Sequence, residues 1–275
     1  MQKRIVILGA GESGTGAALL AISKGFDVFV SDSGKIRDQY RSVLEARDIK
    51  FEEGSHSVDM IMLADIIIKS PGIPGKAPVV VMAREKGIPV ISEIEFAGRY
   101  TGAYKIFITG SNGKTTTANL IYYLLKESGL NVGLAGNVGK SFALQVAEDN
   151  YDNYVIELSS FQLDDMFDFR ADISVLLNIT PDHLDRYDYI FQNYIDSKFR
   201  IINNQGAGDR FIFWADDPVI AKEIKKRNPA VQLLPFSAER EEGMAAFIHN
   251  NELTLSIHNK TETIMTIHDL ALKGR

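Results

Sequence analysis

Cysteine is missing from the 275-residue sequence, so disulfides, thiolate metal sites and cysteine nucleophiles are excluded. Basic residues do not dominate either. The 30 Lys and Arg against 36 Asp and Glu give a net charge of −6, which argues against broad contact with nucleic-acid phosphates. Long apolar runs and a signal-peptide pattern are also missing. We therefore expect a cytoplasmic protein that binds neither nucleic acid nor a membrane.

Short apolar runs that alternate with helical segments indicate an α/β fold. In the first part of the chain a helix is predicted at 14–24, between two β-branched runs. Strands that alternate with helices form a parallel sheet with helices on both faces. The strands predicted here span residues 4–8, 27–31, 66–70 and 89–92. The pattern predicts a Rossmann-like parallel-sheet domain over residues 1–98.

A second unit starts at residue 105, where the run KIFIT predicts a strand that leads into a glycine-rich turn and a helix at 114–128. A later helix is predicted at 189–203, from apolar residues at helical spacing. The further strands predicted in this unit span residues 154–158, 173–177 and 210–215. We assign residues 99–275 to this second domain.

The alternation of strand and helix patterns does not continue in the last part of the chain. Residues 246–248 and 253–257 flank Asn250-Asn251, a pair that predicts a tight hairpin. The chain then stops at 272–275 (LKGR) with no closing element visible. We therefore expect the second domain to be incomplete at its C-terminal end.

The first motif is Gly9-Ala10-Gly11-Glu12-Ser13-Gly14, which fits G-x-G-x-x-G between a strand and a helix. Such glycines let the backbone approach a diphosphate, and the helix N-terminus supplies N–H donors. Asp32, at the end of the next strand, can accept hydrogen bonds from a ribose or a base. The motif fits a nicotinamide or flavin dinucleotide, a UDP-sugar, or a tight turn without a ligand. The segment SPGIP, residues 70–74, predicts a rigid turn at the same sheet edge.

The second motif is TGSNGKTT at 109–116, which follows a strand and opens a helix. Its backbone N–H groups can cradle phosphates, Lys114 can reach the β- and γ-phosphates, and Thr115 can offer its hydroxyl to Mg²⁺. The strict P-loop pattern requires a glycine where Ile108 stands, so this loop is a shortened variant. A glycine-rich turn with a helix cap is the alternative. The motif predicts a P-loop-type ATPase domain.

Three ionisable residues follow later elements of the second unit. Glu157 directly follows apolar strand residues, which suits a Mg²⁺ ligand, and His183 follows the next strand. Lys198 stands four residues after Tyr194 on the predicted helix, so the two share a face. A salt-bridged glutamate, a structural histidine and a solvated lysine are the alternatives, and the spacing alone does not exclude them.

Taken together, these strings resemble the Mur ligase family over nearly the whole chain. The resemblance rests on TGSNGKTT, GNVGKS, ELSSFQL, LNITPDHLDRY and Tyr194-x-x-x-Lys198, with the SPGIP turn. ELSSFQL and NITPDHLDRY look most like the member that adds D-glutamate to UDP-N-acetylmuramoyl-L-alanine. The resemblance implies a three-domain, ATP-dependent ligase, here without its C-terminal amino-acid-binding domain. It implies two Mg²⁺ ions, and we expect a monomer.

The resemblance also implies roles for single residues. Its substrate-binding residues are Gly11, Glu12, Ser13, Asp32, Ser33, Ser70, Gly72 and Asn137, so the first loop would hold a UDP pyrophosphate and no nicotinamide. Its ATP-binding residues are Gly110, Ser111, Asn112, Gly113, Lys114, Thr115 and Thr116. Its metal ligands are Thr115 and Glu157 for one ion and His183 and Lys198 for the other. Lys114, His183 and Lys198 would be catalytic.

Lys198 would act as a carbamate, because a bare ammonium repels Mg²⁺ whereas a carbamate offers an anionic oxygen. Carbamylation requires a neutral amine and hence a depressed pKa.

The implied reaction has two steps: ATP phosphorylates the L-alanyl carboxylate, and the amine of D-glutamate then displaces phosphate. Three rivals remain open. They are a family member with another amino acid or acceptor, an NAD-dependent oxidoreductase, and a non-catalytic nucleotide-binding module. The oxidoreductase leaves GSNGKTT and the pair Glu157 and His183 unexplained. We expect this chain alone to bind the UDP-linked substrate without completing turnover.

Overall fold

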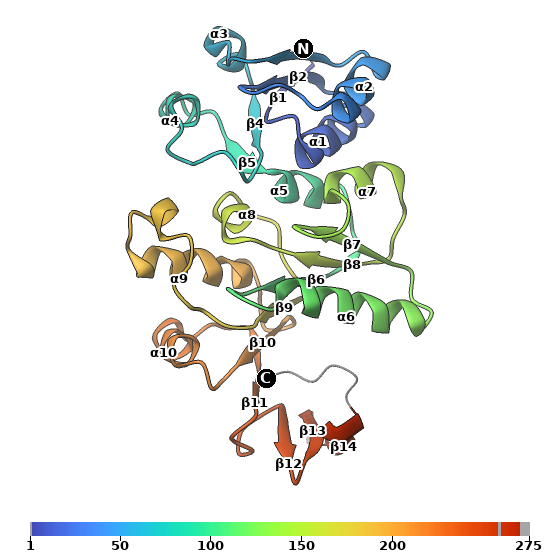
Figure 1. The fold of residues 1–275 in the computed structure, drawn as a ribbon, viewed down its shortest axis with the longest axis vertical. Coiled ribbons are helices and arrows are strands. Elements are labelled where there is room, and N and C mark those ends of the chain that lie inside the picture. Colours follow the sequence, from blue (N-terminus) through green and yellow to red (C-terminus); the bar gives the residue numbers. More distant parts are fainter. Residues whose placement is uncertain (1, 258–259, 270–275) are drawn as a thin grey trace.

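The computed structural model describes residues 2–257 and 260–269, so the predicted chain end at 272–275 lies outside the described residues. The chain forms two sheets, one above the other in Figure 1. The upper sheet is parallel, with strand order β3-β2-β1-β4-β5. Its strands are β1 (Arg4–Leu8), β2 (Asp27–Asp32), β3 (Lys50–Glu53), β4 (Ile66–Lys69) and β5 (Val90–Ser92). Its helices are α1 (Glu12–Ser23), α2 (Asp38–Ala46), α3 (Val58–Ile61), α4 (Pro78–Glu85) and α5 (Glu93–Gly98).

The lower sheet has the order β14-β13-β12-β11-β10-β9-β6-β8-β7 and is parallel from β12 to β7. Its strands are β6 (Tyr104–Thr109), β7 (Val132–Gly136), β8 (Asn153–Glu157), β9 (Ile173–Leu176), β10 (Arg210–Trp214), β11 (Gln232–Ser237), β12 (Ala246–His249), β13 (Glu252–Ile257) and β14 (Lys260–Thr266). Its α-helices are α6 (Lys114–Glu127), α7 (Phe142–Glu148), α8 (Ser160–Asp164), α9 (Phe191–Phe199) and α10 (Pro218–Arg227), and the 3₁₀ helices of this half are η1 (Leu184–Tyr187), η2 (Arg200–Ile202) and η3 (Ile267–Asp269).

Alternation of side chains along the central strands explains the two layers on each sheet. In β1, Ile5 and Ile7 pack on the side of α1, whereas Val6 and Leu8 pack on the side of α3 and α4. In β6, Ile106 and Ile108 pack against α6, and Phe107 points to the opposite face. Because both faces are covered, each of these two strands contains an apolar run, Ile5–Leu8 in β1 and Ile106–Ile108 in β6.

The two halves of the chain share one apolar core. Ile5 and Ile7 of the upper sheet belong to the same buried cluster as Phe107 and Ile156 of the lower sheet. Helices α5 and α7 lie between the sheets (Figure 1) and contact each other. Helix α1 also contacts α7, and Gly16 of α1 lets the two helices approach closely, because a methyl group on it would lie 2.1 Å from the hydroxyl oxygen of Ser141 at the start of α7.

The predicted α/β class and the two sheets are confirmed. The hairpin is also confirmed, since Asn250 and Asn251 both have positive φ between β12 and β13. The helix predicted at 189–203 was too long, because Asp188 and Tyr189 adopt positive φ and α9 starts at Phe191. Within the described part of the chain, no helix combines the length and apolar character needed to cross a membrane. The boundary between residues 98 and 99 stays a prediction.

Candidate functional site

The first glycine turn leads from β1 into α1. Gly9 has φ of +90°, and a methyl group on it would lie 2.7 Å from the hydroxyl oxygen of Ser70. A methyl group on Gly14 would lie 1.8 Å from the carbonyl oxygen of Gly9. Gly11 differs, because a methyl group there would meet nothing within 4 Å. Gly9 and Gly14 are therefore required by the turn itself, whereas Gly11 leaves open space in front of the N-terminus of α1.

Asp32 closes this turn from the neighbouring strand. Its carboxylate accepts a hydrogen bond of 2.7 Å from the Ala10 N–H and one of 2.8 Å from the Gly34 N–H. In this structure Asp32 therefore positions the loop through backbone donors, in addition to the ligand contact predicted for it. The adjacent Ser33 is exposed and lines a cavity of about 480 Å³, into which the SPGIP turn brings Gly72.

Glu12, the first residue of α1, points to the other half of the chain. Its carboxylate accepts a hydrogen bond of 3.1 Å from the N–H of Ser141. Ser141 ends the GNVGKS string and caps α7 with its hydroxyl. The first glycine turn is thus joined directly to the string that contains Asn137. Ser13 is half-buried in the first turn of α1.

The second glycine loop connects β6 to α6, and its Gly113 adopts the left-handed φ of +82° that favours glycine. Gly113 caps α6, so the following N–H groups face the loop, as anion binding at a helix start requires. The ammonium of Lys114 folds back and donates to the carbonyl oxygens of Gly110 and Ser111 at 2.8 and 2.9 Å. Thr115 and Thr116 are exposed on the first turn of α6.

Two residues of the LNIT string hold this loop, and the sequence interpretation gave them no role. The amide oxygen of Asn178 accepts from the Asn112 N–H at 2.8 Å, and its amide nitrogen donates to the Asn112 carbonyl at 3.1 Å. The N–H of Thr180 donates to the Ser111 hydroxyl at 2.9 Å. The adjacent strand β9 therefore fixes the shape of the loop. The signal for this was an asparagine directly after a buried strand beside the loop strand.

Lys198 projects from α9 to the same loop. Its side chain is only 2% exposed, and its ammonium donates to the carbonyl oxygen of Gly110 at 2.9 Å and to the hydroxyl of Thr109 at 3.1 Å. Burial, and next the positive charge of Lys114, lower the pKa of Lys198 to about 7. The structure thus places this lysine at the second glycine loop, with an amine that loses its proton unusually easily.

Glu157 ends β8, the strand beside the loop strand, and is fully buried. One carboxylate oxygen accepts from the amide nitrogen of Asn137 at 2.8 Å. The other oxygen has no hydrogen-bond partner among the described residues. A buried carboxylate oxygen without a donor is costly, and a divalent cation with oxygen ligands would satisfy it. Glu157 therefore fits a Mg²⁺ ligand.

His183 is an exposed residue that directly precedes the 3₁₀ helix η1. Its backbone has φ of +49°, its side chain is 55% exposed, and its ring packs against the ring of Phe161. Among residues 2–257 and 260–269, no three His, Asp or Glu side chains gather as a metal site. The structure brings Lys114, Glu157, Asn137 and Lys198 around one loop, but within that described part no hydrogen bond or ion pair joins His183 to Glu157 or Lys198.

The profile described as "Mur ligase middle domain" matches residues 108–275, and the profile described as "Mur ligase MurD-like, N-terminal domain" matches residues 3–92. These two matches correspond to the lower and the upper sheet.

Two curated relatives carry the name UDP-N-acetylmuramoylalanine–D-glutamate ligase. The protein from Bacteroides fragilis is 59% identical over 276 residues, which cover 99% of this chain and 61% of the relative. The protein from Porphyromonas gingivalis is 54% identical over 271 residues, which cover 98% of this chain and 60% of the relative. This chain therefore spans about 61% of the length of the first of these relatives.

Solved structures share the fold at low identity. A ligase from Neisseria meningitides, described as acting on UDP-N-acetylmuramate and L-alanyl-gamma-D-glutamyl-meso-diaminopimelate, is 22% identical, with a TM-score of 0.63 over 100% of this chain and 89% of that one. The UDP-N-acetylmuramate-alanine ligase from Thermotoga maritima is 18% identical, with a TM-score of 0.55 over 96% of this chain and 58% of that one. These likenesses support the arrangement of the two sheets.

Proposed function

Because the chain belongs to the Mur ligase family, we propose that it is the substrate- and ATP-binding part of an ATP-dependent ligase that adds D-glutamate to UDP-N-acetylmuramoyl-L-alanine. The observation that carries the proposal is the 59% identity, over 99% of this chain, with a relative of that name. The reaction belongs to peptidoglycan precursor synthesis. We expect the protein to work as a cytoplasmic monomer.

The upper sheet would bind the UDP portion of the substrate. Gly11, Glu12 and Ser13 would present backbone N–H groups to the diphosphate at the start of α1, where the helix dipole favours an anion. The open space in front of Gly11 supports this placement. Ser33 and Gly72 would line the uridine pocket, with Asp32 and Ser70 holding the two loops that form it.

The lower sheet would bind ATP along the loop 110–116. Lys114 would release the carbonyl oxygens of Gly110 and Ser111 and donate to phosphate oxygens of the nucleotide instead. Thr115 and Glu157 would hold one Mg²⁺, and His183 with carbamylated Lys198 would hold a second. Bound Mg²⁺ offsets the charge of the phosphate oxygens. Asn137 would touch the substrate while it orients Glu157.

The reaction requires the L-alanyl carboxylate of the UDP-linked substrate to reach the γ-phosphate of ATP. An oxygen of the L-alanyl carboxylate attacks the γ-phosphorus of ATP, and the bond to ADP breaks. The amine of D-glutamate then attacks the acyl carbon, an amide bond forms, and inorganic phosphate leaves with the bonding electron pair. Lys114 would offset the negative charge on the phosphoryl group as it is transferred.

A thermal-shift comparison of UDP-N-acetylmuramoyl-L-alanine, UDP and NADH, each titrated into the chain, tests the substrate class. Stabilisation grows with the ratio of ligand concentration to dissociation constant, so the UDP-linked substrate should raise the melting temperature most. A larger shift with NADH would overturn the proposal in favour of an oxidoreductase.

The acceptor and the amino acid are tested by turnover. A protein of the relatives' full length should release phosphate from ATP only when both UDP-N-acetylmuramoyl-L-alanine and D-glutamate are present. Release with another amino acid would assign the chain to a different family member. Residues 1–275 alone should bind substrate without D-glutamate-dependent phosphate release.

A further inference from the structure

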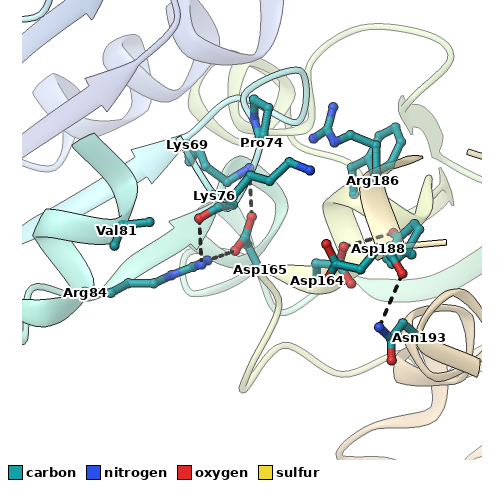
Figure 2. Close-up of a pocket in the computed structure, with 13 residues that line it drawn as sticks. Lys69, Pro74, Lys76, Val81, Arg84, Asp164, Asp165, Arg186, Asp188 and Asn193 are labelled. Carbon is teal, nitrogen blue, oxygen red and sulfur yellow. Dashed lines mark hydrogen bonds and ion pairs between the residues drawn. The ribbon is translucent and has the colours of Figure 1, made fainter. Parts of the chain in front are cut away.

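Asp165 of the lower half holds two cations of the upper half (Figure 2). Its carboxylate lies 2.9 Å from the ammonium of Lys69 and 2.8 Å from the guanidinium of Arg84. Lys69 ends β4 and Arg84 belongs to α4, whereas Asp165 caps the C-terminal end of α8. Both Lys69 and Asp165 are almost completely buried. One carboxylate thus joins the two halves of the chain through an ionic trio.

The same two cations hold the turn that follows β4. Lys69 donates to the carbonyl oxygen of Ile73 at 2.8 Å, and Arg84 donates to that of Gly75 at 3.2 Å. Lys69 and Arg84 therefore hold the turn at Ile73 and Gly75, and each of these cations is oriented and neutralised by Asp165. Arg186 makes longer contacts of 3.4 Å with the same turn, at the carbonyl oxygens of Pro71 and Gly72.

The position of Asp165 is itself firmly set. Helix α8 starts at Ser160, three residues after the buried Glu157, and begins with a capping box in which Ser159 and Gln162 satisfy each other's backbone N–H groups. The backbone carbonyl of Asp165 also accepts a hydrogen bond of 2.8 Å from the N–H of Ser92 in the upper sheet. The segment 157–165 therefore connects Glu157, in the proposed ATP site, to Asp165, whose two cations hold the turn that lines the proposed substrate cavity.

We propose that Asp165 is a positioning residue for the UDP-linked substrate: it sets the shape of the turn at 70–75, through Lys69 and Arg84, without touching the substrate. The inference rests on the proposed function, because it takes the cavity lined by Ser33 and Gly72 as part of the substrate site. The first half would then form a complete substrate pocket only when the second half supplies this carboxylate.

The two cations differ in how much they need Asp165. Lys69 is 2% exposed, so without the carboxylate its ammonium would be buried without a counter-charge, which is strongly unfavourable. Arg84 is 46% exposed and lines a cavity of about 510 Å³, so water can replace part of its ion pair. Loss of the carboxylate should therefore move the Ile73 end of the turn more than the Gly75 end.

The test is titration calorimetry of UDP-N-acetylmuramoyl-L-alanine and, separately, of ADP with Mg²⁺, on the wild-type chain and on Asp165→Asn. We expect the affinity of Asp165→Asn for the UDP-linked substrate to fall by about tenfold or more, since the variant leaves Lys69 unpaired. Its affinity for ADP should stay within about twofold, because Asp165 touches no residue of the loop 110–116.

Glu95→Gln is the matched control. Glu95 is also a buried carboxylate that joins the two halves, since it accepts the N–H groups of Phe167, Asp168 and Phe169, but it contacts no residue of the turn. The control should keep substrate affinity within about twofold. Equal losses in Asp165→Asn and Glu95→Gln would overturn the proposal, because they would indicate a general effect of docking the two halves.

Failure of the proposed function would look different, because the wild-type chain itself would then not bind the UDP-linked substrate. If Asp165→Asn does not fold, Arg84→Gln takes its place, since Arg84 lies at the surface and its loss frees only the Gly75 end. A roughly threefold loss of substrate affinity with unchanged ADP affinity would support the proposal. Unchanged substrate affinity in Arg84→Gln would overturn it.

Discussion

The carboxylate of Glu93, in the upper half of the chain, accepts a hydrogen bond of 2.7 Å from the hydroxyl of Ser141 in the lower half. It also accepts one of 2.6 Å from the N–H of Ala143. Glu93 is fully buried, and Glu12 approaches the same serine from the first glycine turn. Burial, and to a smaller extent the charge of Glu12, raise the pKa of Glu93 to about 7. Two acidic residues of the upper half of the chain thus contact one serine of the lower half.

This raised pKa predicts a pH-dependent stability. Between the ordinary value of 4.5 and about 7, the folded chain holds a proton on Glu93 that the unfolded chain has lost. The free energy of unfolding should therefore fall as pH rises through this window, by up to about 3 kcal/mol from this group. Urea unfolding of the wild type and of Glu93→Gln, from about pH 4.5 to about pH 7, measures the difference. Parallel pH profiles of the two proteins would contradict it.

Gly11→Ala should separate ligand binding from folding. The backbone of Gly11 has φ of −78°, which alanine adopts, and its methyl group would meet nothing within 4 Å. We expect the free energy of unfolding to change by less than about 1 kcal/mol, because a stiffer unfolded chain offsets a poorer helix cap. The affinity for the UDP-linked substrate should drop by about tenfold or more, because the methyl group stands between the diphosphate and the N–H donors.

Gly14→Ala is the companion change within the same motif. Its methyl group would lie 1.8 Å from the carbonyl oxygen of Gly9, so the turn itself must move. Gly14→Ala should lower the free energy of unfolding even without ligand. If Gly11→Ala destabilised the chain as much as Gly14→Ala does, the structural distinction between the two glycines would be wrong.

Lys198 should react with dissolved carbon dioxide. Its pKa of about 7 leaves a large share of the amine neutral at neutral pH, and the neutral amine is the species that forms a carbamate. Nuclear magnetic resonance in isotope-labelled bicarbonate should show a carbamate signal that grows as pH rises through about 7. The signal should be missing from Lys198→Ala and present in Lys105→Ala, a lysine paired with Asp172 on the same sheet. A signal that persists in Lys198→Ala would assign the carbamate to another amine.

Gly16→Ala tests how closely the two halves of the chain pack. The added methyl group would lie 2.8 Å from the Ser141 Cβ and 3.1 Å from the Leu144 backbone nitrogen, and neither atom is free to move far. We expect a loss of about 1–3 kcal/mol in the free energy of unfolding, which urea titration measures. Gly11→Ala, in the preceding turn, serves as the control without a clash.

Elements whose structure depends on neighbouring residues could be predicted from the sequence. The strands that lead into Gly9 and Gly110 have strong β-branched patterns, and Asn250-Asn251 determines its own turn. Contacts between distant segments were not foreseen. The start of α9 at Phe191 follows left-handed residues at Asp188 and Tyr189, and its end at Phe199 continues as the 3₁₀ helix η2.

The site shows the same division. Lys198 was an ordinary helix lysine by spacing, and only the fold shows that it is buried at Gly110. Asp165 and Lys69 are separated by many residues and had no motif to connect them. One signal was present in retrospect: Lys69 is a charged residue that ends the apolar run 66–68 inside a buried strand, and such a residue requires a partner.

One apolar core extends from Ile7 in the upper sheet, through residues of α5 and α7, to Phe107 in the lower sheet. The two halves of the chain therefore do not have separate cores. Cleavage at residue 98 and separation of the halves would expose the buried side chains of Phe96 and Ile94, and the apolar cluster around them, to water. The two halves should therefore unfold together in a single cooperative transition, and a protease should cleave slowly between them.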